Sequence, residues 1–327
     1  MKSYLSTVYL ASSSLRPAEL VPWALAAAAF FLMPDYLALG SRILIFIILV
    51  LSLDLLVGYA GIVTLGHGVF FGIGAYATGI ASASFGISDP IAQLVISALC
   101  AAAVGVVTGS LLLRTSGLTL IMLTLAVLST FHEIGNRATS VTGGADGLAV
   151  TIGSLLGLFQ FDLYGKVAYL YSLFILFSVW LFVRFLCLSP FGASLAGIRE
   201  NRTRMDAIGS RVYRRLVLTY TISAGIAGIA GALLAQTNSF VGLNTLGFDA
   251  SGELLVMLVL GGVGRIYGAF LGTAVFLIAQ DLLARYFPEN WLLGIGILLV
   301  LVILFARGGL LGLFDRLGRF ARTRRQA

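Results

Sequence analysis

Long apolar runs follow one another along almost the whole chain, with short polar segments between them. A helix that spans the hydrocarbon core of a bilayer needs about 20 mostly apolar residues. Runs of that size begin near Val21, and Pro, Gly, Ser and Asp gather in the segments that separate them. The pattern predicts an all-α, polytopic membrane protein of about ten transmembrane helices. The predicted spans are 21–39, 42–57, 59–84, 91–113, 117–135, 166–187, 216–237, 250–263, 265–284 and 290–306.

Two of these spans are weak as continuous helices. Residues 58–79 contain seven glycines, and each glycine in a helix interior costs about 1 kcal/mol relative to alanine. Residues 250–261 are too short to cross a membrane at the rise of an α-helix. We therefore predict one or two broken or re-entrant segments, with breaks at 58–61 and 261–264. Paired breaks in the two halves of a chain indicate a transport pathway; whether 58–79 crosses or re-enters stays open.

Composition excludes a water-soluble domain. Of the 327 residues, 59% are hydrophobic and 11% are charged, and the mean hydropathy is +1.02. Soluble domains carry about 25% charged residues. Residues 1–20 lack the short apolar region and cleavage site of a signal peptide. We predict a cytoplasmic segment over 1–20, a transmembrane permease domain over 21–306 and a basic cytoplasmic tail over 307–327.

The net charge of +7 is distributed very unevenly between the two predicted faces. With ten spans, 17 Lys and Arg residues fall on the face that holds both termini and loop 188–215 with its flanks, and 4 fall on the other. Cytoplasmic loops carry such an excess of basic residues. The distribution predicts a bacterial inner (cytoplasmic) membrane protein with both termini in the cytoplasm. It explains the charge without nucleic-acid binding.

The chain lacks the motifs of an ATPase or a metalloenzyme. Neither of its two lysines lies in a Gly-x-x-x-x-Gly-Lys-Ser/Thr pattern, and His132-Glu133 has no second histidine at the spacing of a zinc site. Cys100 and Cys187 have no partner at metal-ligand spacing, so we expect both to be small buried residues. We predict a transport subunit that is not an enzyme, with no metal and no cofactor of its own.

An ion-coupled secondary transporter or a channel for a small polar solute is the alternative function. Such carriers place acidic residues within the membrane. The candidates are Asp54, Glu133, Glu253 and Asp281. Each lies near a predicted helix end, and no span holds a central cluster of carboxylates, which favours interfacial or interhelical polar contacts.

Loop 188–215 has the composition of a docking element. Pro190 and Gly192 begin a short helix-forming stretch, which is followed by residues of both charges. The positive-inside rule explains the arginines but not Glu200 and Asp206 among them. A mixed-charge surface of this kind is typical of a contact with a soluble partner.

Several segments resemble the permeases of branched-chain amino-acid ABC importers, the LivH/LivM family, and the LivM branch most closely. The matching segments, in the family's order, are Gly58 to Tyr76, Thr142 to Gly147, Ser189 to Gly192, Ile198 to Asn201 with Asp206 to Gly209, and Leu260 to Gly264. Ala269 and the basic Asn201-Arg-Thr-Arg204 depart from the family pattern. These departures, together with the range of solutes that related permeases carry, leave the solute open among branched-chain amino acids, urea, amides and aromatic acids.

The resemblance implies a role and partners for this chain. It implies half of a translocation pathway, a second homologous permease, two ATPase subunits that bind ATP and Mg²⁺, and a periplasmic solute-binding protein. The implied ATPase-coupling residues are Ser189, Pro190, Phe191, Gly192, Arg199, Glu200, Asn201, Arg202, Asp206, Ala207 and Gly209. The pathway candidates are Gly58, Tyr59, Gly61, Thr64, Gly66, His67, Gly68 and Tyr76. The candidates that face the binding protein are Thr142, Gly143, Gly144, Asp146 and Gly147.

Overall fold

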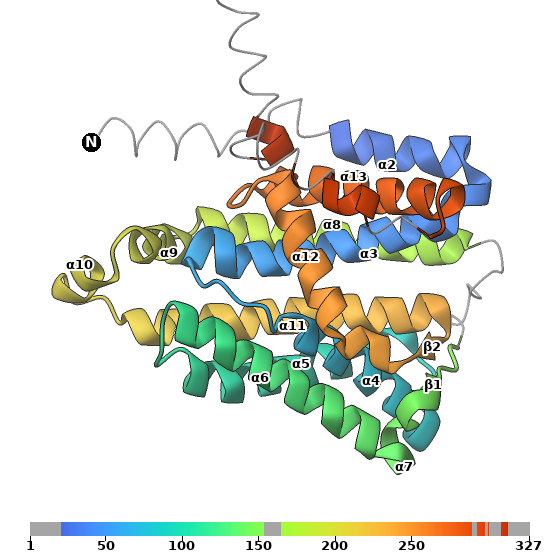
Figure 1. The fold of residues 1–327 in the computed structure, drawn as a ribbon, viewed down its shortest axis with the longest axis horizontal. Coiled ribbons are helices and arrows are strands. Elements are labelled where there is room, and N and C mark those ends of the chain that lie inside the picture. The colour runs from blue at the N-terminus through green and yellow to red at the C-terminus, as the bar shows by residue number, and fades with distance from the viewer. Residues whose placement is uncertain (1–20, 154–164, 290–292, 298–299, 301–308, 313–327) are drawn as a thin grey trace, which may run out of the picture.

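The computed structural model describes residues 21–153, 165–289, 293–297, 300 and 309–312. Long helices lie side by side in a bundle (Figure 1). Within the described residues, seven helical segments are long and apolar enough to cross a membrane. The helices are α2 (Val21–Leu32), η2 (Pro34–Tyr36), α3 (Leu37–Asp54), η3 (Leu55–Ala60), α4 (Gly68–Phe85), α5 (Pro90–Leu112), α6 (Leu118–Arg137), α7 (Thr139–Thr142), η4 (Gly144–Asp146), α8 (Lys166–Leu188), α9 (Pro190–Glu200), α10 (Arg202–Ala207), α11 (Val212–Asn238), η5 (Leu243–Leu246), α12 (Phe248–Gly261) and α13 (Ile266–Tyr286).

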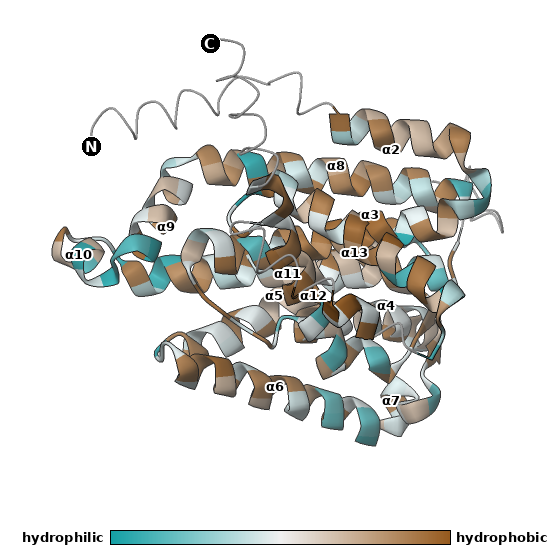
Figure 2. Ribbon diagram, turned by 45° about the horizontal axis from the view of Figure 1, so that its top comes forward, coloured by the Kyte–Doolittle hydropathy of each residue, from teal (hydrophilic) through white to brown (hydrophobic). Residues whose placement is uncertain are grey.

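The bundle has two distinct ends. At one end lie α9 and α10, and at the other lie two short strands, β1 (Leu148–Ala149) and β2 (Phe240–Val241) (Figure 1). The strands pair antiparallel, with Leu148 opposite Val241. Hydrophilic residues gather at α10 and at helix ends, whereas the helices between are mostly apolar (Figure 2). This distribution is that of a chain whose middle lies in a bilayer.

Helix α11 forms the centre of one half of the bundle because it is lined with small residues. Ala224, Ala227 and Ala232 are fully buried. A Cβ atom on Gly228 would lie 2.5 Å from the Cβ of Ala101 in α5, so the two backbones approach closely. Small residues recur every four positions along 216–237, and at Gly228 they serve packing within this chain.

The other half is built around α3, which is apolar on every side. Its residues from Leu44 to Asp54 are all buried, and they contact α8, α11, α12 and α13. A helix that is hydrophobic all round belongs in the interior of a bundle. Asp54, which is 1% exposed, ends this helix, and the functional geometry begins there.

The predicted fold class, an all-α polytopic membrane protein, is confirmed. The structure also shows the path of the glycine-rich segment 58–79. Gly61 lies against Arg199 of α9, and Gly79 lies against Leu148 and Val241 at the opposite end. Residues 58–79 therefore cross the bundle by a broken path. Most of the predicted span 290–306 lies outside the described residues, as do the N-terminal segment and nearly all of the basic tail; the three-part division of the chain stays a prediction.

The prediction that both cysteines are buried is wrong for Cys100. Its side chain is exposed on α5, whereas Cys187 is partly buried. Helix α5 buries only the face toward α4 and α11, since its other face carries exposed Val95, Leu99 and Val106. Apolar sequence alone does not distinguish a face turned to protein from one turned to lipid.

Candidate functional site

The two helix breaks lie against each other. In the first, the π-helical turn η3 follows α3 and ends at Ala60 with Gly61 as its C-cap, and the chain then runs to Gly68 without helix or strand. The second separates α12 from α13. A Cβ atom on Gly58 would lie 2.6 Å from the backbone nitrogen of Gly264, so only a residue without a side chain permits this approach.

Asp54 fastens the second break to the end of α3. This carboxylate is 1% exposed, and its Oδ1 accepts a hydrogen bond of 2.7 Å from the backbone N–H of Gly264, 210 residues away along the chain. Its Oδ2 is buried without a hydrogen-bond partner among the described residues. A hydrogen bond to an ionised acceptor is stronger than a neutral one, so one carboxylate holds two distant segments together.

Arg199 of α9 reaches both breaks. Its Nη1 donates a hydrogen bond to the carbonyl oxygen of Gly58. A Cβ atom on Gly61 would lie 3.0 Å from the Cγ of Arg199, and one on Gly264 would lie 3.0 Å from its Nη1. The side chain therefore fits a groove that these glycines leave open. We refer to Asp54, Gly58, Gly61, Arg199 and Gly264 as the break junction.

Beyond Gly61, polar groups of α6 and α12 hold the irregular segment. The backbone N–H of Leu65 donates to Thr124 Oγ1 at 3.4 Å, and that of Gly68 donates to Ser251 Oγ at 3.0 Å. A side chain on Gly66 would overlap the carbonyl oxygen of Thr124. Side chains of other helices thus satisfy backbone groups that a continuous helix would pair internally.

His67 is buried and ties α3 to the start of α4. It is 1% exposed, and its Nε2 lies 2.7 Å from Ser52 Oγ. Because the Ser52 hydroxyl donates to the carbonyl oxygen of Leu49 at 2.6 Å, His67 Nε2 is the donor in this pair. Ser223 of α11 donates to the Ser52 carbonyl at 2.5 Å, which joins a third helix to the network.

The predicted pathway residues divide into a buried and an accessible group. Thr64 and Tyr76 are nearly as buried as His67. Tyr59 is partly buried and lies beside Cys187 at the end of α8. Gly61 lies on the open surface. The structure brings most of these residues together along the first break, and their role as pathway lining stays a prediction.

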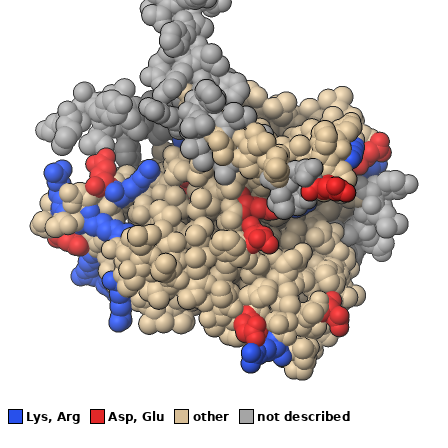
Figure 3. Space-filling view, viewed as in Figure 1, with Lys and Arg blue, Asp and Glu red and all other residues tan. Residues whose placement is uncertain are grey.

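An accessible face near the first break carries Val63, Asp249 and Gly252, which the sequence analysis did not single out, and Glu253, which it considered only for ion coupling. Val63 is 43% exposed, and a Cβ atom on Gly252 would have no described atom within 4 Å. Asp249 is exposed and Glu253 partly so, and Figure 3 shows acidic atoms in the middle of an uncharged area over α12. Asp249, Gly252 and Glu253 are spaced three and four residues apart and so share one face of a helix, which is the signal that could have identified them.

The predicted coupling loop folds as two short helices with different burial. Ser189 caps α9 by accepting a hydrogen bond from the N–H of Gly192 at 3.4 Å. A Cβ atom on Gly192 would lie 2.6 Å from the carbonyl carbon of Cys187, so α9 follows α8 too closely for a larger residue. The side chains of α9 that are buried toward the bundle belong to Ser194, Leu195 and Ile198, and Phe191 packs at their edge.

Helix α10, by contrast, has no buried residue within its described length. Asn201 caps it by accepting a hydrogen bond from the N–H of Arg204 at 2.9 Å. Ile208, just after it, is 71% exposed. The exposed residues around Ile208 include both acidic and basic side chains. Gly209, which follows it, has a left-handed backbone conformation. The exposed predicted coupling residues are Pro190, Arg199, Glu200, Asn201, Asp206, Ala207 and Gly209, with Arg202 partly exposed.

Residues 36–304, which include both breaks and the coupling loop, match the family described as "Branched-chain amino acid transport system / permease component". The chain belongs to this family. It is therefore a permease subunit of this ABC transport type, as the sequence resemblance indicated.

Individual relatives agree with the family. The chain is 30% identical to the high-affinity branched-chain amino acid transport system permease protein LivM of Escherichia coli (strain K12), over 84% of this chain and 69% of that protein. It is 27% identical to the probable branched-chain amino acid transport permease protein LivM of Methanocaldococcus jannaschii, over 82% and 90% respectively. The corresponding LivH protein of Escherichia coli (strain K12) is 30% identical over 45% of this chain and 46% of that protein. No solved structure matches the chain.

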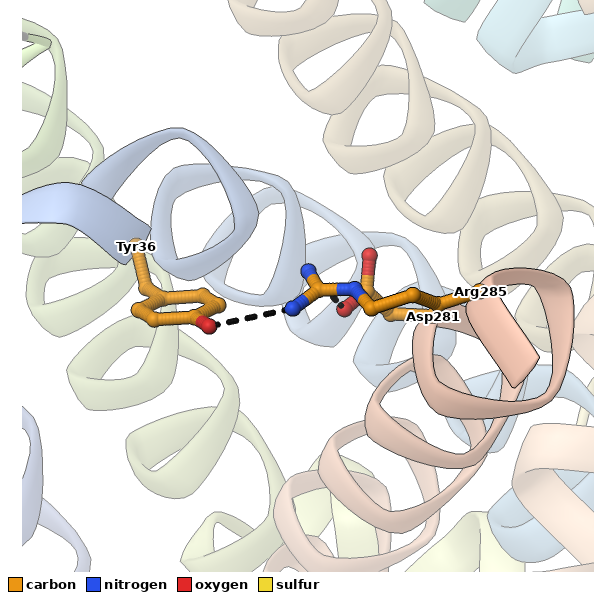
Figure 4. A network of polar contacts seen from close by, with 3 residues as sticks. All are labelled: Tyr36, Asp281 and Arg285. Atoms are coloured by element: carbon orange, nitrogen blue, oxygen red, sulfur yellow. Dashed lines mark hydrogen bonds and ion pairs between the residues drawn. The ribbon is translucent and has the colours of Figure 1, made fainter.

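Membership of this permease family replaces the ion-coupled alternative, and the four carboxylates proposed for that alternative have other contacts. Asp54 binds Gly264, and Glu253 lies 3.5 Å from the side-chain amide nitrogen of Gln280. Glu133 pairs with Arg137 on the surface of α6. Arg285 binds Asp281 at 3.2 Å and the Tyr36 hydroxyl at 3.1 Å, which connects α13 to η2 (Figure 4).

The segment Thr142 to Gly147, which matches the family's pattern, is a tight turn at the strand end of the bundle. The Thr142 hydroxyl donates to the carbonyl oxygen of Gly135 at 2.6 Å and accepts from the N–H of Gly144 at 3.2 Å. Gly143, Gly144 and Gly147 have φ values of 72°, 57° and 71°, a region that favours glycine. Asp146 is exposed. Of the predicted binding-protein contacts, this side chain is therefore the accessible one, and the others shape the turn.

Proposed function

We propose that this permease is one of two homologous membrane subunits of an ABC importer for branched-chain or related amino acids. The proposed importer also contains two ATPase subunits, which bind ATP and Mg²⁺, and a periplasmic solute-binding protein. The printed names of the relatives support the choice of solute. The charge distribution supports a bacterial inner membrane with both termini in the cytoplasm.

The observation that carries the proposal is the contrast between α9 and α10. Helix α9 is anchored to the bundle through Leu195 and Ile198, which are 1% and 0% exposed. Helix α10 projects from the same end with charged residues and the exposed Ile208. An apolar side chain with charges around it is typical of a protein contact surface. This pair of helices is thus suited to receive a soluble ATPase on one side and to act on the bundle on the other.

The opposite end supports the place of the binding protein. The β1–β2 pair and the turn before it lie at that end, and Asp146 projects from the turn. Between the two ends, the first break passes beside the accessible face of α12. We propose that this face, together with its counterpart on the second permease, lines the translocation pathway.

Charge reversal on the coupling loop tests this function. In the reconstituted importer, we expect Glu200→Lys with Asp206→Lys to reduce recovery of the ATPase subunits in a mild-detergent pull-down by at least about fivefold, because each change inverts a charge at the contact. Uptake of labelled leucine into proteoliposomes should fall in proportion. Glu289→Lys changes an exposed acidic residue outside α9 and α10 and should alter neither measurement.

Unchanged ATPase recovery together with unchanged uptake in the double variant would contradict docking at α9 and α10. Uptake by this chain alone, driven by an ion gradient without ATP, would contradict the importer itself.

A further inference from the structure

We propose that Arg199 is a positioning residue that transmits movement of α9 to both helix breaks at once. In the arrangement seen here it holds the breaks together, and displacement of α9 withdraws it and releases them. This inference rests on the proposed role of α9 and α10 as the ATPase-docking element.

Arg199 is placed so that it follows α9 closely. It comes directly after Ile198, which is fully buried and packs α9 on the bundle. Its Nη1 nevertheless reaches the Gly58 carbonyl, on a segment that precedes it by 141 residues, and approaches Gly264 on a segment that follows it. A shift of α9 relative to α3 therefore changes contacts with both breaks in one step.

The junction is shaped for this side chain. Gly61 and Gly264 have φ values of 70° and 79°, so a side chain at either position would be strained as well as crowded. The stem of Arg199 passes over Gly61, and its guanidinium lies beside Gly264. A guanidinium offers several donors in a fixed plane, whereas a lysine ammonium is a compact point charge on a flexible stem. Replacement by lysine is therefore expected to preserve charge and part of the hydrogen bonding, but not the fit.

Asp54 makes the junction sensitive to the withdrawal of Arg199. The positive charge of Arg199 acts on the buried carboxylate and stabilises it electrostatically. With Oδ2 already unpaired among the described residues, loss of that charge leaves Asp54 with the single hydrogen bond to Gly264. An uncompensated buried charge is costly, so the junction without Arg199 favours a rearranged state. This gives the break junction two arrangements, of which α9 selects one.

Cys187 provides a natural reporter of that change. It lies at the end of α8, next to the start of α9, and beside Tyr59 of η3. Movement of η3 away from α8 breaks this contact and opens the thiol to reagents. A Cys100→Ser background removes the chain's other cysteine, which is exposed.

The experiment uses the complete importer in proteoliposomes. We expect Arg199→Gln to retain its ATPase subunits and its ATP hydrolysis but to lower the number of leucine molecules imported per ATP by about tenfold, with the KM for leucine unchanged. Arg199→Lys should restore part of the coupling. Arg214→Gln, which removes an exposed arginine on α11, should behave like the unaltered chain. Cys187 should react with a maleimide faster in Arg199→Gln than in the Cys100→Ser parent.

Several results would overturn the proposal. Normal coupling in Arg199→Gln would do so, and loss of ATPase subunits from that variant would assign Arg199 to docking itself. If Arg199→Gln fails to assemble, the Cys100→Ser parent alone tests the proposal. The proposal then requires that the Cys187 thiol react with the maleimide at different rates in the nucleotide-free and the ATP-trapped importer. Equal rates would exclude opening of the junction. The charge-reversal pull-down is independent of all these readouts, so failure of docking at α9 and α10 is recognised separately.

Discussion

The two helix breaks meet at one junction, but they are built differently. The first consists of a π-helical turn and a long irregular segment, and hydroxyl groups of Thr124 and Ser251 hold its backbone from neighbouring helices. The second is a short turn, and close backbone contacts hold its flanks: a Cβ atom on Gly272 would lie 2.6 Å from the nitrogen of Gly261. A backbone held by side chains can exchange partners and change its path. A backbone held by direct helix contact can only hinge.

The difference indicates separate roles in a moving permease. The first break borders the accessible face and includes most of the pathway candidates. The second sets the angle between α12 and α13, since it joins helices that pack on each other. Three substitutions test this division, each acting on a different part of it.

The largest effect is expected at the contact between the breaks. In Gly58→Val the new side chain meets the Asp54 carboxylate and the Cα of Gly264, the latter at 2.7 Å from Cβ. Neither backbone can move away from the new side chain without displacing the other break. Overpacking of this kind costs about 1–3 kcal/mol, and more where backbone must shift. We expect little folded protein, measured as monodisperse yield after detergent extraction, and loss of uptake in what remains.

Gly252→Val is the matched control for this change. It introduces the same side chain on α12 where no described atom lies within 4 Å. Equal yields of the two variants would show that the breaks do not pack as described.

A smaller effect is expected at the second break alone. In Gly261→Ala the added methyl group would overlap the carbonyl group of Gly268, whose carbon atom would lie 2.5 Å from the new Cβ. We expect a loss of about 2 kcal/mol in stability, seen as a lower unfolding temperature, and a changed angle between α12 and α13. Gly252→Ala adds the same group in open space, where alanine is the better helix former, and should not lower that temperature. A Gly261→Ala variant as stable as this control would contradict a packed hinge.

The smallest effect is expected where side chains hold the first break. Ser251→Ala removes the acceptor of the Gly68 N–H, which is buried. An unsatisfied buried donor costs about 1–3 kcal/mol, and local adjustment of a flexible segment reduces that figure toward about 1. Ser178→Ala provides the control, because Ser178 is exposed and bonds within its own helix. If the Ser251 variant loses more stability than Gly261→Ala, the first break is the more rigid one and the comparison is reversed.

The sequence predicted the breaks better than their meeting. Glycine content and short apolar length mark 58–61 and 261–264 without knowledge of the fold. Their contact depends on how α3, α12 and α9 pack, and no local pattern encodes that distance. For the same reason, Asp54 resembled a candidate for ion coupling: a carboxylate in an apolar run looks unpaired until the N–H of Gly264 is brought to it.

Residue roles in the coupling loop followed a similar division. Capping by Ser189 and Asn201 is local chemistry, and the prediction of a short helix after Pro190 is confirmed. Arg199 was grouped with the docking residues because it lies in a run of residues of both charges that resembles the family's coupling segment. Its approach to Gly58 and Gly264 depends on tertiary structure. His67 shows the converse, since a polar residue in a glycine-rich segment suggested a pathway, and the fold gives it a buried partner in Ser52.

The β1–β2 pair fixes one end of the bundle, about which the long helices could tilt. It joins residues on either side of α8 and α11 at the end farthest from α9. Helix α11 has 27 residues and is therefore about 40 Å long. A tilt of about 5° around that clasp displaces its other end by about 3.5 Å, given this length, which exceeds the length of a hydrogen bond. A displacement of that size at the far end of α11 would be enough to make or break a single side-chain contact there.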